Sequence, residues 1–144
     1  MISYLISYLK GSAAAIIIAS FSLMISSQIV FQDISYIYHD FYGMFVFASI
    51  FGYIYGILGL ACLFLIRWKV YRGIKSYFVF FLLGGIGGTI TEFIFEWDLI
   101  PFLMISTILG SLAFLASQKI KNKVISWIIC VIPSLVIFVF PRFW

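Results

Sequence analysis

The chain has 144 residues, of which 65% are hydrophobic, 21% are aromatic and 10% are charged, and its formal net charge is +4 at pH 7. An average soluble domain contains about 45–50% apolar and about 25% charged residues, so this chain has too few polar groups to cover a water-soluble globule. The composition excludes an ordinary cytosolic enzyme, a disordered tail, a nucleic-acid-binding domain and, with two cysteines, a disulfide scaffold. What remains is a single integral membrane domain of residues 1–144.

Apolar runs of membrane-spanning length recur along the whole chain. A helix rises 1.5 Å per residue, so about 20 apolar residues cross a hydrocarbon core about 30 Å thick. The third run reaches this length only by including a charged residue, Glu92. The sequence therefore predicts an all-α bundle of five transmembrane helices joined by short loops. In chain order, the expected spans are 11–32, 41–66, 76–95, 99–118 and 124–141.

The fifth run contains Pro133 and Pro141 and leaves an alternative open. In a four-span arrangement this segment lies in the membrane interface, and both ends of the chain stand on one side. Trp127 and Trp144 lie near the ends of the run. They favour the five-span arrangement, because tryptophan prefers the boundary between membrane and water.

The few charged residues are sorted by sign. If five helices alternate across the membrane, eight of the nine basic residues fall on one side, and the acidic residues fall on or toward the other. Basic loops resist translocation, so this predicts a cytoplasmic N-terminus and an external C-terminus. Arg142 is the exception. The eight basic residues are Lys10, Arg67, Lys69, Arg72, Lys75, Lys119, Lys121 and Lys123, and the acidic residues are Asp33, Asp40, Glu92, Glu96 and Asp98.

Small residues recur at spacings of three and four in four of the expected helices. Gly52 and Gly56 form a GxxxG motif in the second run, and Gly84 and Gly88 form another in the third. Helices in lipid associate through close contact, which small residues permit. We therefore expect these glycines to lie at helix–helix contacts. A glycine-rich segment can also unwind and present carbonyls to a substrate, and packing is the simpler interpretation.

Glu92 is the charged residue whose position the predicted topology does not explain. Counted from Tyr77, it lies about 22 Å along the third helix. Glu96 follows one turn later on nearly the same face. Ionisable residues at membrane depth are costly and often functional, and two neighbouring carboxylates can share a proton or bind a cation. Glu92 is thus either a proton or cation site or a shallow carboxylate that reaches water, whereas Glu96 fits more simply in the outer loop.

The sequence contains no recognisable catalytic, metal-binding or nucleotide-binding motif. No GxSxG, HExxH or Walker sequence occurs, and the single histidine and the two cysteines fall on opposite sides of the expected membrane. We therefore expect neither an enzyme nor a bound metal or cofactor. The basic loops are explained by topology, so they indicate no nucleic-acid partner.

The chain resembles the small, uncharacterised multi-pass membrane proteins common in spore-forming Gram-positive bacteria. The resemblance covers the whole chain and is carried by its length, its Ile- and Phe-rich spans, its short basic loops and the N-terminal segment MISYLISYLKGSAAA. It implies a location in the cell membrane and carries over no activity. The sequence favours a structural or accessory protein that contacts the lipid bilayer and either a second copy or a larger membrane-protein partner. The alternative is a small cation- or proton-coupled transporter or channel that uses Glu92.

Overall fold

The structure is a computed structural model of the chain, and it describes the backbone of residues 2–31, 36–68, 74–95 and 102–139. Side chains are described for residues 4–26, 28–29, 41–66, 74–94 and 102–139. The described part forms five α-helices, so the expected all-helical architecture is confirmed. In chain order they are α1 (Ile2–Phe31), α2 (Tyr36–Trp68), α3 (Ile74–Phe95), α4 (Phe102–Ser117) and α5 (Lys123–Val139).

Three of these helices are long and apolar enough to cross a membrane. They are α1, α2 and α3, with 30, 33 and 22 residues. Their candidate spans are Tyr4–Ser26, Phe41–Ile66 and Ile74–Ile94. The first begins earlier than the predicted span 11–32, so it contains Lys10, which the charge pattern had placed before the membrane. By length and composition, the protein is therefore a membrane protein with three candidate spanning helices.

The remaining two helices are apolar but shorter. α4 contains 16 residues and α5 contains 17. At 1.5 Å per residue they are about 24–26 Å long, somewhat less than a hydrocarbon core of about 30 Å. The predicted spans 99–118 and 124–141 are longer for two reasons. Residues 99–101 and 140–141 lie outside the described part of the chain, and residue 118 already belongs to the turn after α4.

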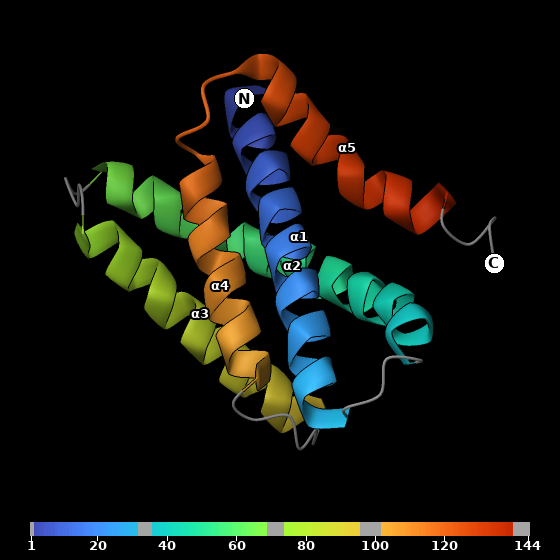
Figure 1. The fold of residues 1–144 in the computed structure, drawn as a ribbon. Helices are drawn as coiled ribbons and strands as arrows, with labels where there is room; N and C mark the ends of the chain where they lie inside the picture. Colours follow the sequence, from blue (N-terminus) through green and yellow to red (C-terminus); the bar gives the residue numbers. More distant parts are fainter. Residues whose placement is uncertain (1, 32–35, 69–73, 96–101, 140–144) are drawn as a thin grey trace.

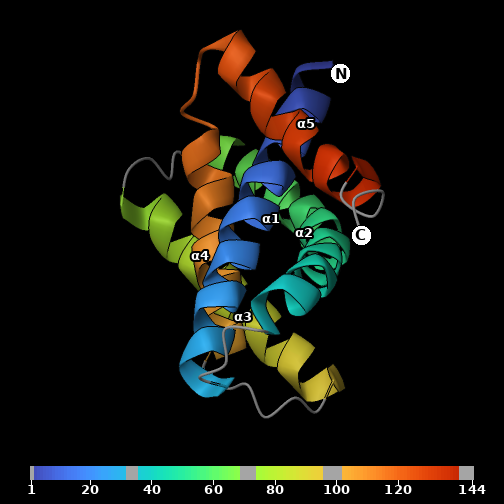
Figure 2. The same cartoon turned by 45° about the vertical axis from the view of Figure 1, so that its right-hand side comes forward.

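α4 lies at the centre of the arrangement, between α1 and α3 (Figure 1). It runs antiparallel to both of them and packs extensively along each. α2 crosses this layer at a steep angle and packs mainly against α1 (Figure 2). α5 lies at the edge of the bundle, where its main contacts are with α1.

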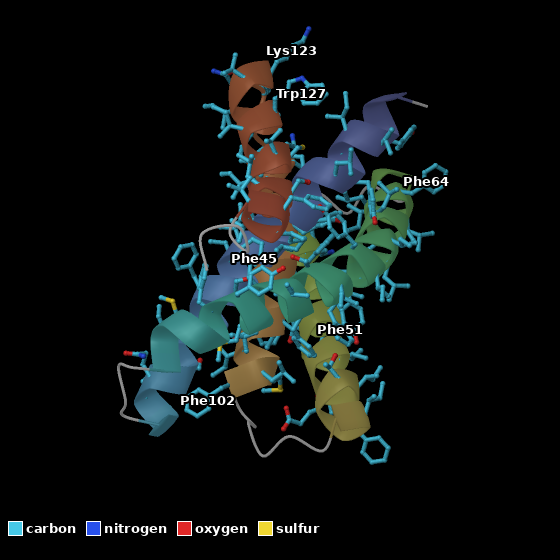
Figure 3. All side chains as sticks on the ribbon, turned by 90° about the vertical axis from the view of Figure 1, so that its right-hand side faces the viewer. Phe45, Phe51, Phe64, Phe102, Lys123 and Trp127 are labelled. Atoms are coloured by element: carbon cyan, nitrogen blue, oxygen red, sulfur yellow. The ribbon has the colours of Figure 1, made fainter. Side chains whose placement is uncertain are left out.

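The buried apolar core forms where α2, α3 and α4 meet. Phe80 and Phe114 are almost completely buried, and their ring centroids lie 5.8 Å apart in a stacked arrangement. Leu63 and Leu115 complete this cluster. On the outside of the bundle, large side chains of α2 and α5 such as Phe64 and Trp127 point away from the core (Figure 3). Such outward apolar surface is typical of helices that face lipid.

A short turn joins α4 to α5. The backbone N–H groups of Gln118, Lys119 and Ile120 donate hydrogen bonds to carbonyls three residues earlier, at 3.0–3.1 Å. These bonds satisfy carbonyls at the C-terminal end of α4 that the helix itself leaves without donors. The side chain of Asn122 accepts a hydrogen bond of 2.9 Å from the N–H of Val124, which is the bond of a helix N-cap. The α4–α5 connection is therefore ordered by its own polar groups.

Candidate functional site

α3 and α4 approach each other most closely at Gly84 and Gly88. A Cβ added at Gly84 would lie 2.6 Å from the Cα of Ile108, and one added at Gly88 would lie 2.7 Å from the Cα of Met104. Real Cβ atoms essentially never come so close to another backbone, so only glycine permits this separation of the two helices. The hydroxyl of Thr107 also donates a hydrogen bond of 2.8 Å to the carbonyl oxygen of Gly84.

α1 meets α4 through a second row of small residues. A Cβ added at Gly110 would lie 3.2 Å from the carbonyl oxygen of Ala15 and 3.3 Å from the Cβ of Ala19. One turn away along α4, the hydroxyl of Ser106 lies 3.0 Å from the hydroxyl oxygen of Ser22. The two helices are therefore joined by close backbone contact and by a hydrogen bond between hydroxyl groups.

α2 meets α1 through the other predicted glycine pair, Gly52 and Gly56. A Cβ added at Gly52 would overlap the side chain of Ile16, and one added at Gly56 would overlap the side chain of Ser12. Ile16 and Ser12 are completely buried by this contact. All four glycines that the sequence singled out thus lie where one helix faces another.

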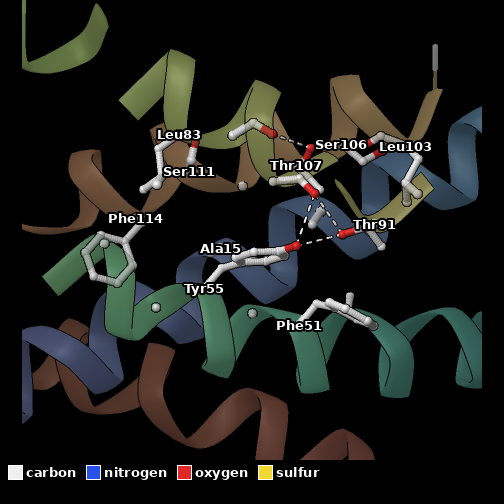
Figure 4. A pocket seen from close by; sticks show the side chains of 18 of the residues that line it. Ala15, Phe51, Tyr55, Leu83, Thr91, Leu103, Ser106, Thr107, Ser111 and Phe114 are labelled. Carbon is white, nitrogen blue, oxygen red and sulfur yellow. Dashed lines mark hydrogen bonds between the residues drawn. The ribbon is translucent and has the colours of Figure 1, made fainter. Parts of the chain in front are cut away.

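A partly enclosed cavity of about 80 Å³ lies between α1, α2, α3 and α4 (Figure 4). We call it the central cavity. Small residues of all four helices form part of its lining, and aromatic rings, leucines and hydroxyl-bearing side chains form the remainder. Phe51 and Tyr55 reach it from α2, and Phe114 reaches it from α4 (Figure 4). The small lining residues are Ala15, Ala19, Ala48, Gly52, Gly56, Gly59, Gly84, Gly87 and Gly110.

The hydroxyl groups around the central cavity hydrogen-bond within the bundle. The hydroxyl of Tyr55 lies 2.9 Å from Thr91 Oγ1 and 3.1 Å from the carbonyl oxygen of Gly87. Thr91 donates to that same carbonyl at 2.8 Å. Ser111 donates a hydrogen bond of 2.6 Å to the carbonyl oxygen of Phe80. The hydrogen bonds of these hydroxyls lie between and within the helices. The surface that lines the cavity is therefore mainly carbon.

Glu92 is buried, with 5% of its surface exposed. It lies one turn beyond Gly88 on the face of α3 that follows α4. Since Gly84 faces Ile108 and Gly88 faces Met104, the same antiparallel register places Glu92 beside the N-terminal end of α4, which begins at residue 102. A helix N-terminus carries partial positive charge and favours a carboxylate. Glu92 is thus buried between helices, two residues before the end of the candidate span Ile74–Ile94.

Lys10 occupies the equivalent position at the opposite end of α4. It is buried, with 7% of its surface exposed, and its ammonium group donates a hydrogen bond of 3.0 Å to the carbonyl oxygen of Ile120, just beyond α4. A helix C-terminus carries partial negative charge and favours a cation. Among the side chains that the structure describes, Lys10 and Glu92 are the charged ones that are buried.

Further polar contacts gather around the α4–α5 turn. The side-chain amide of Gln118 donates a hydrogen bond of 2.9 Å to the carbonyl oxygen of Ser7 in α1. The ammonium group of Lys119 lies 2.5 Å from the hydroxyl of Tyr77 in α3 and 4.8 Å from the centre of its ring. Together with Lys10, these bonds fasten the end of α4 to both of its neighbours.

Several of these groups did not stand out in the sequence. Tyr55 and Thr91 carry no motif, although Thr91 lies one turn after Gly87 on the glycine-rich face of α3. Ser22 and Ser106 are small residues of α1 and α4, and their mutual hydrogen bond depends on how these two helices cross. For Lys10, the available signal was the run of small residues that follows it, which marks a face in contact with another helix.

Glu96, the second residue of the predicted carboxylate pair, lies outside the described residues. In the part of the chain that the structure describes, no three His, Cys, Asp or Glu side chains lie close enough together to hold a metal ion. No protein-family model, curated protein or solved structure matches the chain.

Proposed function

We propose that the chain is a five-span protein of a bacterial cell membrane and serves a structural or accessory role, in contact with a second copy or a larger membrane-protein partner. The three candidate spans support insertion in the membrane. The sorted charges support a cytoplasmic N-terminus and an external C-terminus. In this orientation the ends of the helices alternate, and the α4–α5 turn with its lysines lies on the cytoplasmic side.

The observation that carries the proposed role is that the polar groups of the interior interact with neighbouring helices of the same bundle. The hydroxyls of Ser106, Thr107 and Ser111 bind oxygen atoms of neighbouring helices. Lys10 and Glu92 face the two ends of α4, where helix dipoles favour their charges. Such an interior fixes the shape of the bundle. It offers a partner a rigid apolar surface and offers a substrate little reactive chemistry.

The orientation is tested by fusing alkaline phosphatase to the C-terminus in a bacterial host, because this enzyme folds only outside the cytoplasm. An active fusion is the result expected for five spans. An inactive fusion would contradict the fifth span and support the arrangement in which the last segment lies in the interface. A fusion after Lys121, in the turn between α4 and α5, is the matched control and is expected to be inactive in both arrangements.

The accessory role is tested by light scattering and native mass spectrometry of the protein extracted in mild detergent. We expect either a defined homo-oligomer or a complex with one membrane protein at fixed stoichiometry. Recovery of a homogeneous monomer from the same membranes, both before and after chemical cross-linking, would contradict the role.

The second candidate function is proton or cation transport through Glu92, and the burial of this carboxylate within the candidate span Ile74–Ile94 is the observation that favours it. The two functions differ in one measurement, the flux of protons or monovalent cations into vesicles containing the protein. The accessory role predicts the flux of protein-free vesicles. A higher flux that is lost in Glu92→Gln would overturn the accessory role and establish transport.

A further inference from the structure

We propose that the central cavity binds the end of an acyl tail from a membrane lipid. The proposal rests on the membrane insertion proposed above and assigns a ligand to a cavity that the accessory role does not use. Depth, lining chemistry, size and access each support it.

The depth of the central cavity matches the middle of a bilayer. Its lining includes Ala15, Tyr55 and Gly84. Ala15 lies at the midpoint of the candidate span Tyr4–Ser26, Gly84 lies at the midpoint of Ile74–Ile94, and Tyr55 lies within two residues of the midpoint of Phe41–Ile66. At this depth the medium around a membrane protein consists of the ends of acyl tails. In the proposed membrane, the ends of acyl tails therefore surround the bundle at the depth of the cavity.

The lining of the cavity favours hydrocarbon over water. A buried water molecule needs about two to four polar partners. The hydroxyls of Thr91, Thr107 and Ser111 instead have backbone carbonyl oxygens of α3 and α4 as their acceptors. Water would find few donors there, whereas a methylene group gains dispersion contacts with lining atoms that otherwise face a void.

The size of the cavity fits part of a chain better than a whole molecule. Its volume is about 80 Å³, several times the roughly 10–15 Å³ of probe volume that one water-sized group needs, so the cavity accepts several methylene-sized groups. The flat rings of Phe51 and Tyr55 border this space, and glycines without side chains border it as well. A straight, unbranched chain end matches such a narrow volume.

Helix packing around the cavity is weakest on the side where α2 faces α3 and α4. α4 packs closely along both α1 and α3, and α1 packs closely against α2, whereas α2 and α3 have far fewer contacts with each other. Where they do meet, Tyr55 of α2 lies against Gly87 of α3. We therefore place the route of the acyl tail between α2 and α3.

The test uses vesicles of phosphatidylglycerol that carries a photoreactive diazirine at the end of one acyl tail. After irradiation, mass spectrometry locates the labelled residues. In the wild-type protein we expect label on residues that line the cavity, such as Phe51 and Leu83, in addition to label on outward-facing residues such as Ile54. An excess of the same lipid without diazirine is expected to reduce both labels.

A matched pair of variants separates the cavity from the outer surface. Ala48→Leu fills the cavity, because Ala48 lines it and is 6% exposed. Ala61→Leu makes the same change at an exposed position of the same helix, outside the lining. The leucine side chain takes the space that the acyl tail would enter, so we expect the cavity label to fall about tenfold in Ala48→Leu, which corresponds to about 1.4 kcal/mol of binding free energy. We expect it to stay unchanged in Ala61→Leu.

If Ala48→Leu does not fold, Gly87→Ala replaces it. The added Cβ would lie 3.5 Å from the ring of Tyr55, an ordinary contact that the fold tolerates. Label confined to outward-facing residues, or equal cavity label in Ala48→Leu and Ala61→Leu, would overturn the acyl-tail proposal alone. Absence of label from both surfaces would instead contradict membrane insertion, so the two failures are distinguishable.

Discussion

α4 and α5 have 16 and 17 residues, and both are almost entirely apolar, yet the bundle is built around one of them and carries the other at its edge. The difference lies in the small residues. Those of α4 recur so that two faces of the helix approach a neighbour, whereas most side chains of α5 are bulky and exposed. The buried residues of α4 are Leu103, Ser106, Gly110, Phe114, Leu115 and Ser117, and those of α5 are Ser126 and Pro133.

This contrast shows what decides burial in a bundle of uniformly apolar helices. Lipid is as apolar as leucine, so hydrophobicity alone does not draw one helix inward. Gly110 and Ser106 allow α1 to approach α4 at backbone distance, and α5 offers no comparable row. Pro133 further removes a backbone N–H from α5. Close approach, rather than apolarity, selects the central helix.

The largest effect is expected when the same substitution is made in both helices. Leu103 of α4 is 1% exposed, and Leu135 of α5 is 52% exposed. We expect Leu103→Ala to lower the free energy of unfolding by about 2–5 kcal/mol, because it leaves a cavity in a packed interface. Leu135→Ala is expected to change it by about 0.5 kcal/mol or less. Reversible unfolding in mixed detergent measures both, and equal losses would break the contrast.

The second effect tests the close approach of α3 to α4. Gly84→Ala places a Cβ 2.6 Å from the Cα of Ile108, whereas Gly85→Ala places one 4.0 Å from the end of the Ile108 side chain. We expect the first to lower the free energy of unfolding by about 1–3 kcal/mol. The second is expected to be neutral or stabilising by up to about 1 kcal/mol, through better helix propensity. Equal changes in the free energy of unfolding for Gly84→Ala and Gly85→Ala would show that the backbones of α3 and α4 are not in close contact at Gly84.

A smaller effect is expected at the turn between α4 and α5. Lys10→Met keeps the length of the side chain and removes its hydrogen bond to the carbonyl of Ile120. We expect a loss of about 1 kcal/mol in the free energy of unfolding, reduced in part because a buried charge no longer needs to be desolvated. Lys121→Met, at an exposed position of the same turn, is the control. A loss in the control as large as that in Lys10→Met would assign the effect to overall charge.

The smallest effect concerns the hydroxyl pair between α1 and α4. A double-mutant cycle of Ser22→Ala and Ser106→Ala isolates the coupling across their 3.0 Å contact. Hydrogen bonds between membrane helices average about 0.6 kcal/mol, so we expect a coupling of that size. A coupling indistinguishable from zero would leave the small volume of serine as the reason for its position.

Much of the fold follows from periodicity and composition. Runs of apolar residues located all five helices, and the four predicted glycines lie where helices face one another. The lengths of α4 and α5 do not follow so directly. An uncharged run in the sequence ends at the next charged residue, whereas a helix ends where its backbone hydrogen bonds end. At the end of α4 these differ, since Gln118 is uncharged yet belongs to the turn.

The interior site was less accessible from the sequence. The cavity arises from how α2 crosses α1 and α3, and crossing angles depend on the packing of whole faces. Tyr55 and Thr91 therefore meet by tertiary geometry, from positions 36 residues apart. Lys10 was expected at the membrane surface because positive charge marks topology. Its burial depends on the carbonyl of Ile120, which lies 110 residues away.

The placement of Lys10 and Glu92 has a consequence for how the chain is assembled in the membrane. α4 itself carries no charged residue, so its own side chains provide no electrical signal for one direction of insertion over the other. The lysines of the turn after α4 supply one such signal. Its neighbours add a second, since Lys10 of α1 binds the carbonyl of Ile120 at its C-terminal end and the register of α3 brings Glu92 toward its N-terminal end. If α4 were inserted in the reverse direction, Lys10 would lie near its partly positive N-terminal end and Glu92 near its partly negative C-terminal end, which is unfavourable. We therefore expect the neighbouring helices and the basic turn after α4 to favour the same direction of this helix.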